Sequence, residues 1–313
     1  MRFGLRSLSG VLAAGAAIVA ALGAAAQPAA ATPVQVNLTN LRTIQTFNLD
    51  KKGNDDVYLL VTGVAKSQPV NVRLPEAKTW TSNTKQQAVQ EKQPVTLWKG
   101  DLASGEFALI TVTVMQGKGT DDAKIKEYLG RITAAEKDAA GKKTLASADD
   151  FKTVAKDALK NERAVITKIK DVFSREKKTD HYGGLFNVLV WNNNGKIVKR
   201  LDPVGLTFGE HNGTDVKIYT KLKNTRSNVM VADPNKPGEF AQQSLAPLSD
   251  DQATIRVKML ETEYTQEAGR KVRNVTDYLA DLQVLDNGKP VKWELQGDNP
   301  GADEIHEYWD WAS

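Results

Sequence analysis

The chain has 313 residues, of which 42 are Lys or Arg and 38 are Asp or Glu, and it contains no cysteine. The lack of cysteine excludes a disulfide framework, a zinc or iron–sulfur site built on thiolates, and a thiol nucleophile. The formal net charge of +4 is small and spread along the chain, which argues against a nucleic-acid-binding surface because phosphate binding requires concentrated Lys and Arg.

Residues 1–31 predict a secretory signal peptide. Arg2 and Arg6 precede an apolar run over 11–26 that is rich in Ala, and small residues suited to cleavage follow it. The run falls short of the roughly 20 strongly apolar residues that a membrane span requires. No later segment has about 18 apolar residues in a row, so we expect a mature chain without a transmembrane segment, secreted or in the cell envelope.

Short β-type runs follow over 34–115. They are rich in Val, Ile, Leu, Thr and Tyr and are separated by clusters of Gly, Pro, Asn and Asp. The run 56–64 is almost continuously apolar and predicts a central strand. The run 107–115 alternates, which places Thr111 and Val112 on opposite faces. We expect these two runs to supply the two inner faces of an antiparallel β-sandwich.

After residue 121 the apolar residues recur with the spacing of an α-helix. From 147 to 173 the apolar side chains follow one helical stripe, and Ser147 with Asp150 resembles a helix cap. A weaker helical pattern covers 122–139. The sequence therefore predicts an α-helical hairpin at 121–176, inserted between strands of one sheet system.

After residue 183 apolar and polar residues alternate again, as they do in a β-strand. The runs 185–191 and 196–201 flank an Asn-Gly pair, which predicts a hairpin and completes a sandwich over 32–231. Prolines with Gly, Ser and Asp predict a linker at 232–252. The remaining residues, 253–313, predict a smaller C-terminal β unit that ends in an acidic, aromatic tail.

One loop carries the pattern of a cation site. Asp50, Asp55 and Asp56 lie within seven residues around Gly53, just before the predicted central strand. Ca²⁺ takes six to eight oxygen ligands from flexible loops, so these carboxylates can converge on it. The glycine spacing is not that of an EF-hand. Asp, Asn and Gly are also common in turns, so a solvated hairpin turn is the alternative interpretation.

The same loop resembles the first calcium loop of the C-two domain, the membrane-binding β-sandwich module of the synaptotagmins and conventional protein kinase C. The family pattern is Asp-x-x-Gly-x-Ser-Asp-Pro-Tyr-Val. Asp50, Gly53, Asp56 and Tyr58 match it at the same spacing. The resemblance covers about residues 34–222.

Two later segments stand in the places of other motifs of that family. Residues 114–118 replace Val-x-Asp-x-Asp, and residues 180–183 resemble Asp-x-x-Gly. Gln116 and Lys118 stand where two bridging carboxylates belong, and an ammonium group there repels a cation. The resemblance implies a C-two-like sandwich, with Asp180 as a further ligand of Ca²⁺.

We therefore predict an exported, non-catalytic binding protein that binds a lipid, glycan or protein at an envelope or extracellular surface with the help of Ca²⁺. Two other functions remain open. A carbohydrate-binding sandwich would present Trp80, Trp191 or Trp309 in a row on one sheet face. A hydrolase would place one of the three histidines beside a serine and an acid, although the sequence has no Gly-x-Ser-x-Gly or His-Glu-x-x-His motif.

Overall fold

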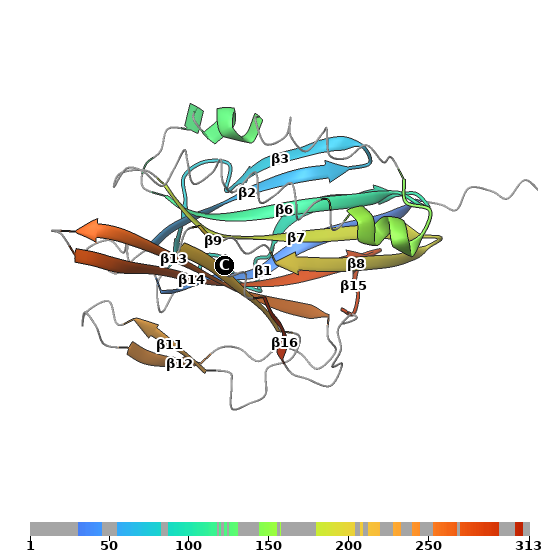
Figure 1. The fold of residues 1–313 in the computed structure, drawn as a ribbon. Coiled ribbons are helices and arrows are strands. Elements are labelled where there is room, and N and C mark those ends of the chain that lie inside the picture. The colour runs from blue at the N-terminus through green and yellow to red at the C-terminus, as the bar shows by residue number, and fades with distance from the viewer. Residues whose placement is uncertain are drawn as a thin grey trace, which may run out of the picture.

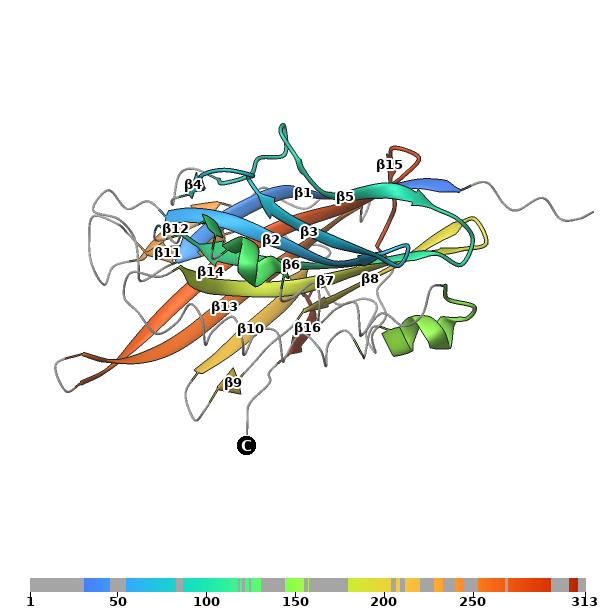
Figure 2. The same cartoon turned by 90° about the horizontal axis from the view of Figure 1, so that it is seen from above.

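The computed structural model is mainly β, with two antiparallel sheets in an arrangement consistent with a β-sandwich (Figure 1). Seen from above, the strands of one sheet cross over those of the other (Figure 2). The predicted fold class is confirmed at this level. The residues that the structure describes are 31–45, 55–82, 87–117, 119, 122–123, 125–130, 144–154, 157, 180–203, 207–208, 212–219, 228–232, 240–244, 253–267, 270–293 and 304–308.

The first sheet has the strand order β3-β2-β6-β7-β8, and β4 also pairs with β2. Its turn between β7 and β8 contains Asn194 and Gly195, whose φ angles are 51° and 90°. This is the turn geometry that an Asn-Gly pair favours, so the predicted hairpin is confirmed. The strands are β2 (Asp55–Ala65), β3 (Gln68–Leu74), β4 (Trp80–Ser82), β6 (Phe107–Gln116), β7 (His181–Asn193) and β8 (Lys196–Pro203).

The second sheet has the order β16-β10-β13-β14-β1-β5, with β9 on β10 and β15 on β14. A separate two-stranded sheet, formed by β11 and β12, contacts β1 through β11. The strands are β1 (Thr32–Gln45), β5 (Val95–Leu102), β9 (Thr207–Phe208), β10 (Asn212–Tyr219), β11 (Asn228–Ala232), β12 (Phe240–Ser244), β13 (Thr254–Glu267), β14 (Arg270–Asp286), β15 (Lys289–Pro290) and β16 (Glu304–Tyr308).

The two strongest predicted strands lie in the same sheet and not in facing sheets. β2 pairs with β6 from Val57 to Ala65. β2 is apolar at nearly every position because both of its faces are buried. Val57 and Leu59 point into the sandwich core, and Tyr58 and Leu60 are buried on the opposite face. The expectation that these runs supply two facing layers is therefore wrong.

The C-terminal strands belong to the sandwich itself. β14 pairs with β1 along a register that runs from Val34–Asp286 to Gln45–Asp277, and β13 pairs with β14 along its whole length. Residues 254–286 are therefore central in the second sheet rather than part of a smaller unit of their own. Of the predicted linker 232–252, the structure describes Ala232 and β12.

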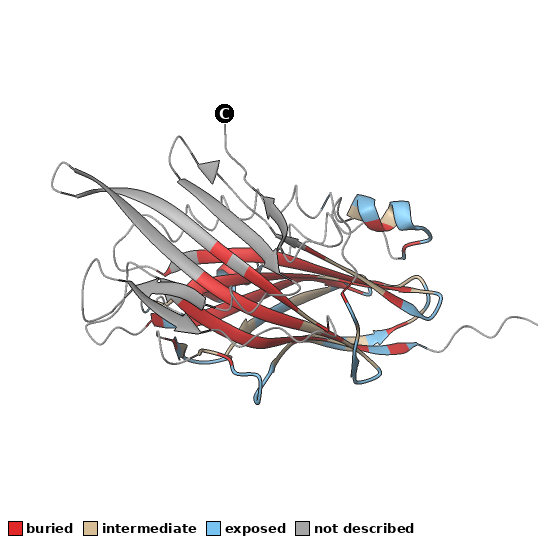
Figure 3. Ribbon diagram, turned by 90° about the horizontal axis from the view of Figure 1, so that it is seen from below, coloured by how far each residue is buried: buried red, intermediate tan, exposed pale blue. Residues whose placement is uncertain are grey.

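The core lies between the two sheets, where the inward residues of β2, β6 and β7 meet those of β1, β13 and β14. Figure 3 shows these strands as buried over much of their described length. Fully burying one such aliphatic side chain contributes about 1.5–3 kcal/mol. The members with no exposed surface include Val36, Leu38, Leu59, Val61, Ile110, Val112, Val188, Val257 and Leu282.

The helical insertion joins β6 to β7, which pair with each other. Its described helical segments, 125–130 and 148–154, are short and do not form a clear hairpin. Most residues of the predicted helices, and residues 1–30 of the predicted signal peptide, lie outside the described residues. The predicted cap is present, because the Asp150 amide donates to Ser147 Oγ at 3.1 Å. Phe151 stacks on Trp191 with ring centroids 5.7 Å apart, which ties this segment to the outer face of the first sheet.

Candidate functional site

The segments that carry the predicted cation motifs lie side by side at one end of the first sheet. β2 begins at Asp55, β6 ends at Gln116, and β7 begins at His181, directly after Asp180. Val57 pairs with Gln116, and Gln116 pairs with His181. Asp55, Asp56 and Asp180 are therefore neighbours at this end, whereas Asp50 and Lys118 lie outside the described residues.

Asp55 points into the core and binds donors from three other strands. Its Oδ2 accepts hydrogen bonds from Thr43 Oγ1 at 3.0 Å and from the Tyr278 hydroxyl at 2.8 Å. Its Oδ1 accepts one from Gln116 Nε2 at 2.5 Å. Thr43 lies on β1, Tyr278 on β14 and Gln116 on β6, so this carboxylate connects the two sheets. All four side chains are buried.

A glycine makes room for the tyrosine of this cluster. A Cβ atom on Gly183 would lie 2.3 Å from Cε2 of Tyr278, so the ring packs directly against the backbone of β7. Burial, the charge of Asp55 and the hydrogen bond to Asp55 raise the pKa of Tyr278 well above its ordinary value. The hydroxyl thus remains a proton donor to Asp55.

The raised pKa of Tyr278 predicts a loss of stability at high pH. The unfolded chain loses the Tyr278 proton near pH 10, whereas the folded chain keeps it. The contribution of Tyr278 to the free energy of unfolding is therefore complete below about pH 10. Above that pH the free energy of unfolding falls by about 1.4 kcal/mol per pH unit. Denaturant unfolding at about pH 9 and about pH 11 measures the fall. Tyr278→Phe should be less stable at both values but should show a smaller fall. An equal fall in the two proteins would contradict the prediction.

Asp180 lies on the other side of the same sheet. It is buried and accepts a hydrogen bond of 2.7 Å from the Tyr58 hydroxyl. Tyr58 is three residues from Asp55 along β2, so the two side chains point to opposite faces. Burial first, and then Asp180, raises the pKa of Tyr58. The Arg73 guanidinium lies over the Tyr58 ring, 4.8 Å from its centroid.

The three described carboxylates therefore do not converge. Asp55 faces the core, Asp180 binds Tyr58 on the outer face, and Asp56 is exposed to solvent. Among the residues that the structure describes, no group of three His, Asp or Glu side chains could hold a metal ion. Of the predicted ligands that the structure describes, Asp56 is the one with an exposed side chain.

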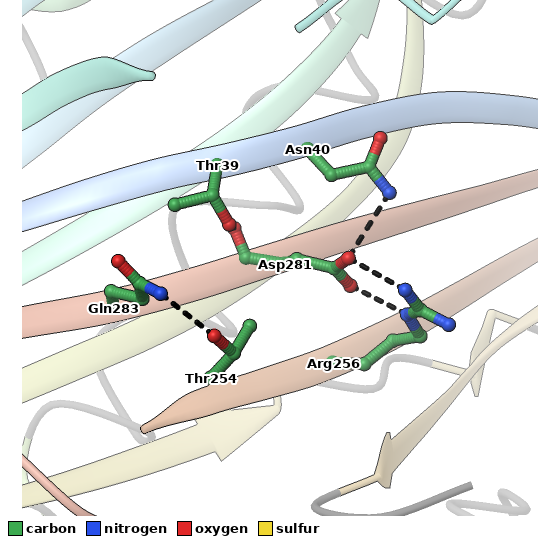
Figure 4. A network of polar contacts seen from close by, with 6 residues as sticks. All are labelled: Thr39, Asn40, Thr254, Arg256, Asp281 and Gln283. Carbon is green, nitrogen blue, oxygen red and sulfur yellow. Dashed lines mark hydrogen bonds and ion pairs between the residues drawn. The ribbon is translucent and has the colours of Figure 1, made fainter. Parts of the chain in front are cut away.

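A second polar cluster lies on the outer face of the second sheet, and sequence reasoning missed it. Arg256 on β13 donates to Asp281 on β14 through Nε at 2.6 Å and through Nη2 at 2.7 Å (Figure 4). Asn40 Nδ2 on β1 donates to the same carboxylate at 3.2 Å. Arg256 is 2% exposed and Asp281 6%. A bidentate, buried pair of this kind is the strong form of a salt bridge.

The register of three strands brings this cluster together. Asn40, Asp281 and Arg256 lie opposite one another on β1, β14 and β13. A bulge in β1 next to Asn40 also lets Thr39 donate to the Asp281 carbonyl at 3.2 Å. Burial first, and then the charge of Arg256, lower the pKa of Arg42. Alternation along each strand assigns these residues to an outward face, and only the pairing shows that they meet.

The structure describes some of the residues that a carbohydrate-binding protein or a hydrolase would use. Trp191 is buried beneath Phe151, Trp80 is half-buried, and Trp309 lies outside the described residues. The side chains of the three histidines are likewise not among those described. Val72 is the one exposed large hydrophobic residue in the described part of the chain.

Comparison with protein-family models, curated proteins and solved structures finds no match to the chain. Within the described residues, no helix has both the length and the apolar character needed to cross a membrane.

Proposed function

We propose that the protein is an exported, non-catalytic binding protein whose ligand surface is the end of the sandwich where β2 and β7 begin and β6 ends, with Ca²⁺ assisting the binding. The observation that carries this proposal is the convergence of three segments, 55–58, 114–117 and 180–183, at that end. These are the segments whose motifs resemble the calcium-binding region of C-two domains. Export rests on the pattern of residues 1–31.

The ligand set for Ca²⁺ centres on Asp56. Asp56 is exposed, and its own carbonyl accepts a hydrogen bond of 2.6 Å from the Gly117 amide, which fixes the loop end against β6. Asp55 and Asp180 hold their positions through bonds to Tyr278 and Tyr58, so they contribute negative charge near the site rather than coordinating oxygens. The second carboxylate of the sequence motif is Asp50, six residues before Asp56 in the chain.

Calorimetric titration of the mature protein with CaCl₂ tests the proposal, together with thermal unfolding in calcium and in chelator. We expect saturable binding and a rise in melting temperature, equivalent to about 2.7 kcal/mol at a hundredfold excess over Kd. Asp56→Asn should weaken binding at least about tenfold, because it removes a charged ligand. If calcium neither binds nor raises the melting temperature of the wild type, the proposal is wrong.

Asp101→Asn is the matched control. Asp101 is also exposed on a strand, but it pairs with Pro33 at the opposite end of β1 from Thr43. Its substitution should leave the calcium affinity unchanged. Sedimentation with vesicles of phosphatidylserine and phosphatidylcholine, with and without calcium, then tests whether the surface ligand is a lipid.

A further inference from the structure

The buried cluster around Asp55 contains a hydroxyl nucleophile, a base and an acyl group. Thr43 Oγ1 donates to one carboxylate oxygen of Asp55, and Gln116 Nε2 donates to the other. A general base must lie within hydrogen-bond reach of the proton that it removes, and Asp55 meets this condition at 3.0 Å. We propose that Thr43 and Gln116 react to form an ester bond between their side chains, with Asp55 transferring the proton.

The reaction is an acyl transfer from nitrogen to oxygen. Asp55 takes the proton of Thr43 Oγ1 while this oxygen attacks Cδ of Gln116, which gives a tetrahedral intermediate. Asp55 then returns the proton to Nε2, the bond between Cδ and Nε2 breaks, and ammonia leaves. The product is one ester bond, one molecule of ammonia and a regenerated Asp55. No oxidant, metal or cofactor is needed.

The position of Gln116 suits the second half of this sequence. Its leaving nitrogen is already hydrogen-bonded to the carboxylate that must protonate it, at 2.5 Å. The Tyr278 hydroxyl donates to the oxygen of Asp55 that also faces Thr43, and the packing of Tyr278 against Gly183 fixes that geometry. Asp55 therefore holds the hydroxyl of Thr43 on one oxygen and the amide of Gln116 on the other, and holding two reactants on one group removes part of the entropic cost of their reaction.

Burial protects the product. Thr43 is 4% exposed, Asp55 1%, and Gln116 and Tyr278 not at all, so water that would hydrolyse an ester is excluded. The bond would join β1 in one sheet to β6 in the other, and it would constrain the unfolded chain as a disulfide does. An exported protein that lacks cysteine cannot form a disulfide that would constrain its unfolded chain.

Mass spectrometry of the denatured wild-type protein tests the proposal. We expect an intact mass that is lower than the sequence mass by one ammonia, and a linked pair of tryptic peptides, 43–51 and 100–118. Hydroxylamine should cleave the pair. A mass that equals the sequence mass overturns the proposal. Replacement of the Gln116 amide by a carboxyl group, without a link, also overturns it, because Asp55 would then activate water instead of Thr43.

Variants identify the roles of the three residues. Thr43→Val and Asp55→Asn should each abolish the mass loss, and Thr39→Val, a buried threonine on the same strand, should retain it. Asp56→Asn keeps Asp55 intact and should also retain the link. A retained link in Thr43→Val would overturn the assignment of the nucleophile. The wild-type mass decides the proposal even if a variant fails to fold, and it does not depend on the calcium titration.

Discussion

Replacing Asp281 by alanine is expected to lower the free energy of unfolding by about 3–5 kcal/mol. The substitution removes both bonds to Arg256 and the bond from Asn40, and it leaves a guanidinium that is 2% exposed without its carboxylate. A buried charge that loses its partner is costly, because the interior solvates it poorly. Denaturant unfolding of the two proteins measures the difference.

Two further variants separate the buried pair from charge effects in general. In the double variant Asp281→Leu with Arg256→Met both charges are removed, and most of the lost stability should return because no unpaired charge is left in the interior. Lys152→Ala breaks a pair with Asp149 that is exposed on both sides, and it should change stability by less than about 0.5 kcal/mol. An effect of Asp281→Ala no larger than that of Lys152→Ala would contradict the prediction.

The sequence predicts the strands of this protein well because strand periodicity is local. The Asn-Gly turn at 194–195 and the cap at Ser147 follow from residues within a few positions of one another. The pairing of strands is not local. β14 joins β1 although Asp286 and Val34 lie at opposite ends of the chain, and no local pattern specifies that partner.

The same distinction explains the candidate sites. Asp55 lies two residues before the core residue Val57, so strand alternation alone points it inward, away from a solvated cation. Its partners Thr43 and Tyr278 come from strands on the other sheet, which sequence reasoning had no means to place. In the sequence, Gln116 only departs from a carboxylate pattern. Its amide is the matching donor for the carboxylate of Asp55.

Gly63→Ala is expected to destabilise the protein by about 3–5 kcal/mol, the sum of backbone strain and steric overlap. Gly63 lies two residues before the end of β2 with a φ of 138°, a backbone conformation that residues with a side chain rarely adopt. An added Cβ would lie 2.0 Å from the carbonyl oxygen of Leu109 on β6. Relief of this contact requires the two central strands of the first sheet to move apart.

The turn residue Gly195 provides the matched control for this substitution. It also has a positive φ, 90°, but an added Cβ there would meet no atom within 4 Å. Gly195→Ala should therefore lower the free energy of unfolding only through backbone strain, by about 1 kcal/mol. Thermal and denaturant unfolding of both variants measure the contrast. If the two substitutions cost the same, steric overlap between β2 and β6 contributes nothing, and the close approach of these strands at Gly63 does not constrain the residue there.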